Sequence, residues 1–207
     1  MAIADGMAIT CDDLQSVGGT RLIALRAHTT TEEVVFDDTL HTIDEIDQST
    51  GVSANWGVWE SRIESSSLTV SGSNEGKEFT TYECTLSWFI PGLTTLQFNQ
   101  IYKFDGDCLM AMIIDNNDTA SGTTAPSASH LHNKVIGLSN TLANEDLNAC
   151  ERTQQWCRLQ SVEGGTGAAF SDEIGVTVTL VATQYEIPRT YVGTITLDAD
   201  GLGLVTS

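Results

Sequence analysis

The chain has 207 residues, which suits one folded domain with a full core and is short for two. Its 28 acidic residues outnumber nine basic ones and give a formal net charge of −19. This charge argues against a nucleic-acid-binding protein, because such proteins neutralise phosphates with Lys and Arg. The sequence also lacks an apolar run near the roughly 18 residues that a membrane-spanning helix needs, so we expect no membrane partner.

The start of the chain indicates a protein made in a cytoplasm, and the cysteines indicate free thiols. Residues 1–6 lack the basic start and apolar stretch of a signal peptide. The cysteines are odd in number and have no CxxC spacing, which disfavours a disulfide framework or a zinc site. We expect buried free thiols, with a Cys150–Cys157 pair as the alternative. The five are Cys11, Cys84, Cys108, Cys150 and Cys157.

The first part of the chain predicts short strands separated by polar turns. Apolar or alternating runs predict strands at 20–27, at 34–36 and from Trp59 to Ile63. Residues 40–47 fit a strand or a helix equally well. A polar loop is expected over 49–57, and residues 65–76 fit either an exposed strand ending in a turn at 74–76 or a flexible connection.

The middle of the chain has the clearest alternation. Apolar side chains at Tyr82, Cys84, Leu86, Trp88 and Ile90 alternate with polar ones, which predicts a central strand with two different faces. Pro91-Gly92 ends this strand. A short helix follows over Leu93–Lys103, with Leu93, Leu96, Gln97 and Gln100 along one stripe. The run 109–114 has no polar interruption, which predicts burial on both faces.

The second part of the chain adds further strands around one long polar segment. Residues 115–129 form that segment, and loops of this length in compact domains usually serve a function or are disordered. Strands are expected at 134–138, 154–162 and 174–182, whereas 140–149 fits a helical turn or a loop. The strand at 174–182 alternates, with Ile174, Val176, Val178, Leu180 and Ala182 on one face and Thr177, Thr179 and Thr183 on the other. The tail at 190–207 has the pattern of a β-hairpin with Asp200-Gly201 in its turn.

No motif in the sequence predicts a catalytic, cofactor-binding or metal site. Gly164–Gly167 enters a strand and lacks the Lys of a phosphate-binding loop, so we expect a turn. His130 and His132 lack ligand partners at metal spacing. The acidic stretches 115–118 and 198–201 each match only half of a calcium loop. His28 and His41 have no Ser or Cys in a recognisable nucleophile context, so we expect a protein that is not an enzyme and carries no cofactor.

Several features in chain order resemble the tail tube (major tail) proteins of tailed bacteriophages. A segment Ile9–Leu14 precedes the first strand, the long alternating strand Phe79–Ile90 leads into the short helix, and the strand Leu109–Asp115 ends in an Asp-Asn-Asn loop. The closing element, Gly165–Thr183, contains an Asp-x-x-Gly-x-Thr-x-Thr pattern at Asp172–Thr179. The hairpin at 190–207 departs from the family pattern.

The resemblance implies one antiparallel β-sandwich or barrel over residues 1–207, flanked by a short helix. It also implies a virion protein whose subunits form six-fold rings stacked into a tube, with sheets joined into one inner barrel. Other tail proteins and passing DNA would be its partners, and residues 49–57 or 115–129 would reach a neighbouring subunit. A closed ring leaves no sheet edge free, and an acidic lumen would let DNA slide without specific binding.

Two other functions are compatible with the sequence. One is a different virion part, such as a tail terminator, a connector ring or a head decoration protein. The other is a carbohydrate- or receptor-binding β-sandwich that uses Trp56 and Trp59, although packing explains those residues equally well and Trp88 fits the core.

Overall fold

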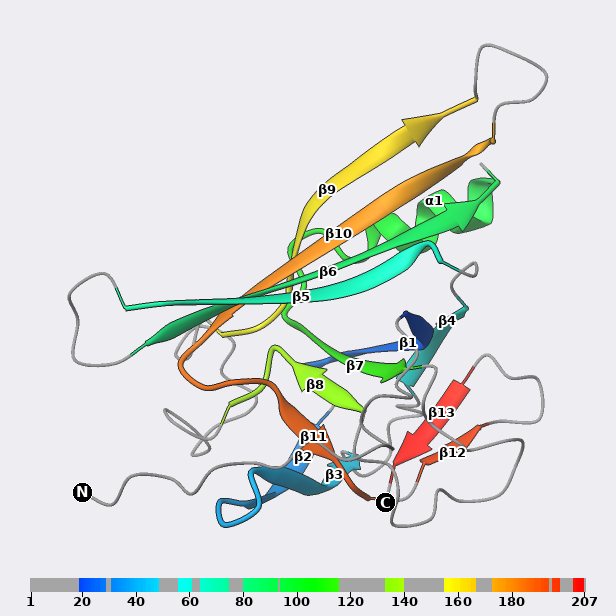
Figure 1. Ribbon diagram of the computed structural model, residues 1–207. Helices are drawn as coiled ribbons and strands as arrows, with labels where there is room; N and C mark the ends of the chain where they lie inside the picture. The colour runs from blue at the N-terminus through cyan, green and yellow to red at the C-terminus, as the bar shows by residue number, and fades with distance from the viewer. Residues whose placement is uncertain are drawn as a thin grey trace, which may run out of the picture.

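The described part of the chain is mainly β-structure with one short helix, as the sequence predicts. In a computed structural model, the described residues are 19–28, 31–48, 56–60, 64–74, 80–92, 94–115, 133–139, 155–166, 173–193, 195–197 and 203–206. They form two sheets (Figure 1). The first contains, in spatial order, β12 (Ile195–Leu197), β13 (Gly203–Thr206), β4 (Trp56–Glu60), β1 (Thr20–Ala27), β7 (Leu109–Asp115), β8 (Lys134–Ile136), β11 (Arg189–Tyr191), β3 (Thr42–Gln48) and β2 (Thr31–Asp37). The second contains β5 (Ser66–Ser73), β6 (Thr81–Pro91), β10 (Gly175–Gln184) and β9 (Arg158–Gly165). The described helix is α1 (Thr95–Tyr102), in which Ile101 is buried and Leu96 of the predicted stripe is exposed.

Several predicted boundaries need correction. Residues 40–47, which the sequence left undecided, contain most of strand β3, which ends at Gln48, and the segment 65–76 contains strand β5. Strand β4 begins at Trp56, three residues earlier than expected, because Trp56 and Gly57 pair with β13. Gly164 and Gly165 end strand β9 instead of forming a turn. A Cβ on Gly164 would lie only 2.1 Å from the Gly175 carbonyl oxygen, so glycine permits the close approach of β9 to β10.

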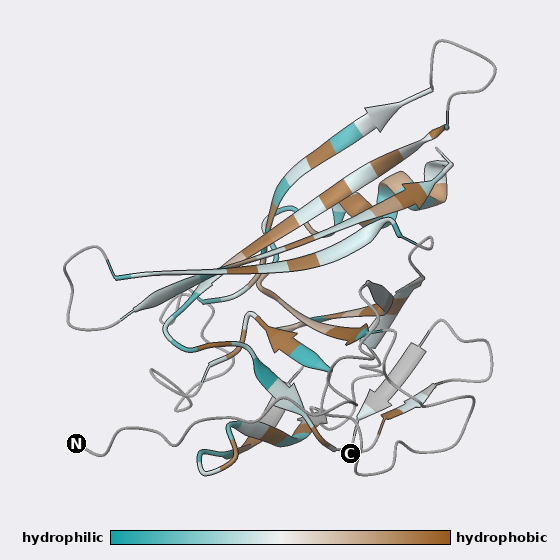
Figure 2. Ribbon diagram, viewed as in Figure 1, coloured by the Kyte–Doolittle hydropathy of each residue, from teal (hydrophilic) through white to brown (hydrophobic). Residues whose placement is uncertain are grey.

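The four-stranded sheet is antiparallel throughout and follows the alternation seen in the sequence. Strands β6 and β10 pair along their length from Gly175–Pro91 to Gln184–Tyr82. Apolar residues alternate with polar ones along these strands (Figure 2). The apolar side chains fill one face, and on β6 and β10 they are Cys84, Leu86, Trp88, Ile90, Val176, Val178, Leu180 and Ala182. Ile174 lies just outside β10 and is exposed, contrary to the expectation that it continues the buried face.

The first core lies between the two sheets. It joins the apolar face of the four-stranded sheet to Ile23, Leu25, Leu109, Ala111 and Ile113 of the other sheet. Strand β7 is buried on both faces, as predicted, because Met110, Met112 and Ile114 point into a second core. This sandwich-like packing is the arrangement in which each sheet hides one apolar face.

The second core lies on the other face of the nine-stranded sheet. It forms because the sheet curls, which brings strands from different parts of the sheet together. Trp56 of β4 is far in the sheet order from the neighbouring strands β11 and β3, yet it is completely buried together with Tyr191, Ile43 and Ile46 of those strands. The Trp56 indole donates a hydrogen bond to the Thr206 hydroxyl (3.2 Å), which donates to the Ile46 carbonyl oxygen (2.8 Å). The sheet does not close into a barrel, and it is mixed, not purely antiparallel, since β11 runs parallel to β3.

The C-terminal hairpin is part of this sheet. Strands β12 and β13 pair with each other as expected, and β13 also pairs with β4. Residues 189–191 belong to β11 and lie outside the hairpin. The predicted turn at Asp200-Gly201 lies outside the described residues.

Arg189 fixes β11 against the β2–β3 turn. Its guanidinium donates to both carboxylate oxygens of Glu186 (2.9 and 2.8 Å) and to Asp38 (2.7 Å). It also donates to the carbonyl oxygens of Asp37 and Thr42. The buried guanidinium is therefore paired and hydrogen-bonded, which a charge in a protein interior requires.

We predict that Gly137→Ala strongly destabilises the fold, because a Cβ at Gly137 would lie 2.8 Å from the Cys157 Sγ and from the Leu109 carbonyl oxygen. Gly106→Ala is a matched control: both glycines have a left-handed φ, +80° and +81°, but no atom lies within 4 Å of a Cβ at Gly106. In the control, the free energy of unfolding should fall only by about 1 kcal/mol, the cost of a left-handed φ for alanine. In Gly137→Ala it should fall by at least about 2 kcal/mol more, because of the steric clash. Urea unfolding of both variants measures the difference, and equal losses would contradict the packing shown here.

Candidate assembly interface

Of the histidines singled out in the sequence, His28 and His41 are described, and each lies within hydrogen-bond distance of a backbone carbonyl oxygen. His28 is buried, and its Nε2 lies 2.7 Å from the Gly137 carbonyl oxygen. His41 is exposed, and its Nε2 lies 2.9 Å from the Ile187 carbonyl oxygen. A carbonyl oxygen only accepts, so each ring nitrogen must be the donor. Across the part of the chain that the structure describes, no group of three or more His, Cys, Asp and Glu side chains is placed to hold a metal ion.

Other predicted features lie outside the described residues. They are the loop residues 116–129, His130 and His132, most of the loop 49–57, residues 140–149, the acidic turn 198–200, and Cys11 and Cys150. Cys84 and Cys157 are buried free thiols, as expected, whereas Cys108 is half-buried. Burial raises the pKa of Cys84 to about 12 and also raises the pKa of Cys157, so both thiols stay protonated near neutral pH. Because Cys157 is a free thiol in the structure, the alternative of a Cys150–Cys157 pair is not supported.

The tryptophans do not form an exposed platform. Trp56 is completely buried, and Trp88 lies in the first core as predicted. Trp59 packs edge-on against Trp88 and Phe104, with ring centroids 6.4 and 5.4 Å away. Trp56 and Trp59 therefore do not form an exposed surface on which a carbohydrate ring could stack. Among the described helices, none is long and apolar enough to cross a membrane.

The feature that calls for a partner is the four-stranded sheet, whose two outer strands each have a free side. Strand β5 pairs only with β6, and β9 only with β10, among the strands that the structure describes. In β5 (SSLTVSGS) there is no charged residue or proline, the usual protections of an exposed edge. Strand β9 carries a bulge at Gln160, but its pairing is regular from Ser161 to Gly165. These edges are suited to pairing with another strand.

Each free edge also carries an exposed valine on the apolar face of the sheet. Val70 of β5 lies opposite Cys84, and Val162 of β9 lies opposite Val178. Both partners are completely buried, whereas Val70 is 41% and Val162 is 39% exposed. A strand added at either edge would therefore cover apolar surface in addition to forming backbone hydrogen bonds.

The strand directions favour joining one edge to the other. Each neighbouring pair in the order β5-β6-β10-β9 is antiparallel. Because the number of strands is even, β5 and β9 run in opposite directions. When copies are placed side by side in the same orientation, β9 of one copy therefore meets β5 of the next in antiparallel fashion. This is a head-to-tail contact, which can close into a ring.

The face of the four-stranded sheet that points away from the core is polar and nearly uncharged. Its described side chains are mostly Ser and Thr, with two carboxylates and one guanidinium. By register with the buried face, they are Ser67, Thr69, Ser71, Ser73, Thr81, Glu83, Thr85, Ser87, Phe89, Arg158, Ser161, Glu163, Thr177, Thr179, Val181 and Thr183. The hydroxyl row at Thr177, Thr179 and Thr183 is the one that the sequence predicted.

Comparison with known proteins assigns the chain to no family and to no fold of known function. The chain matches no protein-family model, and no similar chain was found among curated proteins or solved structures. The function must therefore be inferred from the chain's own residues and from the two free edges.

We predict that His28 makes folding stability depend on pH. Burial lowers the pKa of His28 below its ordinary value of 6.5, although the bond to Gly137 partly opposes this. The unfolded chain then binds a proton more readily, so stability is full above about pH 6.5 and falls as the pH drops toward the folded-state pKa.

His28→Gln removes the titrating ring and retains an amide donor for the Gly137 carbonyl oxygen. Urea unfolding between pH 7.5 and 5 should therefore show a smaller loss of stability on acidification for this variant than for the wild type. Parallel pH profiles for the two proteins would rule out this role of His28.

Proposed function

We propose that the chain is a structural virion protein, the tail tube subunit of a tailed bacteriophage, whose copies form closed rings around a bore. The observation that supports this most is the pair of free edges on a sheet with an even number of strands. The resemblance in the sequence implies six-fold rings stacked into a tube, and the strand directions allow an antiparallel junction between the copies of such a ring.

Ring closure would give hydrogen-bond partners to the backbone N–H and C=O groups on the free sides of β5 and β9. An eight-residue strand such as β5 turns about four N–H and four C=O groups toward its free side. Each bond formed there is worth about 0.5–1.5 kcal/mol, and covering Val70 and Val162 adds apolar burial. A closed ring repeats this contact at every junction and leaves no edge for further growth.

In this arrangement the polar face of the four-stranded sheet lines the bore, because the opposite face is occupied by the first core. Six such sheets joined edge to edge give a barrel of roughly 115 Å circumference and about 37 Å diameter between backbones, before strand tilt widens it. Short Ser and Thr side chains leave this width open for a passing DNA duplex.

The bore wall would be weakly charged. The described part of the polar face contributes Glu83, Glu163 and Arg158, a small share of the chain's net charge of −19. With a single cation per copy on this wall, DNA finds few groups that neutralise its phosphates, and so it binds weakly. Among the described residues of this face, Glu83 and Glu163 are the acids that would line the lumen.

The edge contact predicts the outcome of single substitutions. Val70→Lys and Val162→Lys should each prevent ring formation, because a charge would be buried at the junction. Both valines are exposed in the single chain, so the variants should fold normally. The matched control is Val35→Lys, since Val35 is also 39% exposed and lies on β2, an edge strand of the other sheet.

Light scattering and electron microscopy of the purified proteins measure the result. We expect a loss of assembly of at least tenfold for Val70→Lys and Val162→Lys, and none for Val35→Lys. Mixing the two edge variants should give a discrete dimer, because each retains one intact edge and the edges are complementary. Dimers of one edge variant alone would instead indicate pairing of like edges, and monomeric wild-type protein at high concentration would refute the proposed function.

A further inference from the structure

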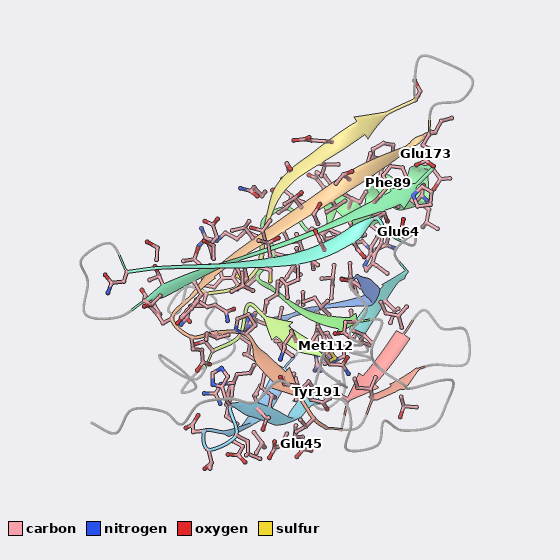
Figure 3. The ribbon with its side chains drawn as sticks, viewed as in Figure 1. Glu45, Glu64, Phe89, Met112, Glu173 and Tyr191 are labelled. Carbon is pink, nitrogen blue, oxygen red and sulfur yellow. The ribbon has the colours of Figure 1, made fainter. Side chains whose placement is uncertain are left out.

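The hydrogen-bonding pattern inside the four-stranded sheet determines which residues of β5 face its free side. In an antiparallel pair, successive residues turn their N–H and C=O groups alternately toward the partner strand and away from it. The Phe89 N–H donates to the Ser65 carbonyl oxygen (3.2 Å), at the end of the sheet where Figure 3 labels Phe89. Every second residue of β5 after Ser65 therefore faces β6, and Leu68 and Val70 turn their N–H and C=O groups toward the free side.

The same alternation assigns the groups on the free side of β9. Because the Gly92 N–H donates to the Ile174 carbonyl oxygen (2.8 Å), every second residue of β10 after Ile174 faces β6, and the residues between them face β9. Ser161 and Glu163 are opposite two of these intervening residues. Val162 lies between Ser161 and Glu163, so its N–H and C=O groups point to the free side.

These assignments leave few registers for a junction between β9 of one copy and β5 of the next. Directly opposite residues of an antiparallel pair exchange both hydrogen bonds or none, and their side chains lie on the same face. Val162 must therefore be opposite a residue of β5 that also faces its free side. Leu68, Val70 and Gly72 are the candidates well inside the strand, and they differ by steps of two residues.

Closure into a barrel distinguishes these registers, because the tilt of barrel strands depends on their stagger. Inside one copy, a row of opposite residues runs from Ser66 on β5, through β6 and β10, to Val162 on β9. If Val162 is opposite Val70 of the next copy, the row returns to β5 four residues beyond Ser66 after crossing four strands. The total stagger then equals the number of strands, whatever the number of copies.

The Val70 register gives the strand tilt that closed barrels have. A stagger equal to the number of strands corresponds to a tilt of about 36°, as in eight-stranded barrels with a stagger of eight, and barrel strands usually tilt by about 35–45°. Pairing with Leu68 would give about 20°, and pairing with Gly72 about 47°. The row also advances toward the C-terminal end of β5. With the polar face inside, this is the direction that the right-handed twist of strands requires.

The side chains also fit the Val70 register. Val70 and Val162 are the exposed valines of the two edges, and as opposite residues they would cover each other. Leu68 would then be opposite Gly164, which has no side chain to compete for the same space. In the Gly72 register, by contrast, each valine would be opposite a glycine and would gain no apolar partner.

We infer that Val162 of one copy lies directly opposite Val70 of the next, and that this register sets the width of the ring. The inference rests on the proposed function, since it takes copies to close through β5 and β9, and it adds which residues meet at the junction. For six copies, a tilt of about 36° widens the barrel to about 45 Å between backbones.

Cysteine pairs on the polar face can measure the register. In the inferred register, Ser161 is opposite Ser71 of the next copy. These two residues form a pair without mutual hydrogen bonds, whose Cα atoms are about 4.5 Å apart, a distance that suits a disulfide. Thr69 and Ser73 of the next copy would lie diagonally from Ser161, at about 7–8 Å, where a disulfide does not form without backbone movement.

The test compares the double variants Ser71→Cys/Ser161→Cys, Thr69→Cys/Ser161→Cys and Ser73→Cys/Ser161→Cys after assembly and oxidation with diamide. Each has one cysteine on either edge of the polar face, so the last two are matched controls for the first. Non-reducing gel electrophoresis measures the covalent multimers, and the single variants give the background from native cysteines. We expect at least tenfold more crosslinked protein from Ser71→Cys/Ser161→Cys than from either control.

The outcomes separate the register from the proposed function. A stronger crosslink from either control, equal crosslinks from all three pairs, or rings without any crosslink would overturn the register and leave the proposed function intact. If the cysteines prevent assembly, hydrogen exchange of the wild type is the second measurement. The Val70 and Val162 amides should exchange at least tenfold more slowly in rings than in monomers, and unchanged exchange would overturn the inference. A wild-type protein that stays monomeric overturns both.

Discussion

The fold depends on strand β7, which is buried on both faces and so belongs to two cores at once. Its side chains alternate between the contact with the four-stranded sheet and the interior of the curled nine-stranded sheet. A strand of this kind cannot lie at a surface or an edge, because either face would expose apolar residues. The position of β7 therefore fixes where both sheets pack.

The four-stranded sheet is supported on one face only, and this shapes what the protein can do. Its apolar face rests on the first core and on α1, whereas no strand or helix among the described residues covers its polar face or pairs with the outer sides of β5 and β9. Proteins usually protect such edges with charges, proline or covering loops. Strand β5 has neither charge nor proline, and the bulge in β9 affects only one end of that strand. The two free edges, of which β5 has neither charge nor proline, are the physical basis for proposing that copies complete one another's sheets.

Much of the local structure could be predicted because burial repeats with a fixed period along a strand. The alternation in β6 and β10 and the continuous apolar run of β7 were enough to predict their faces. The orientation of α1 could not be predicted, since Leu96 and Ile101 are equally apolar and only the surrounding core distinguishes them. Likewise, the start of β4 at Trp56 depends on its partner β13, which lies about 150 residues away in the chain.

The sequence alone determined the mainly β class, the acidic surface, the absence of recognisable catalytic motifs and the faces of the central strands. These are properties of composition and short-range periodicity, which act over a few neighbouring residues. Only the tertiary structure decided which strands are left at edges, that β11 runs parallel to β3, and that Trp56 is buried. Strand order and burial arise from contacts between distant segments, and no local pattern specifies them.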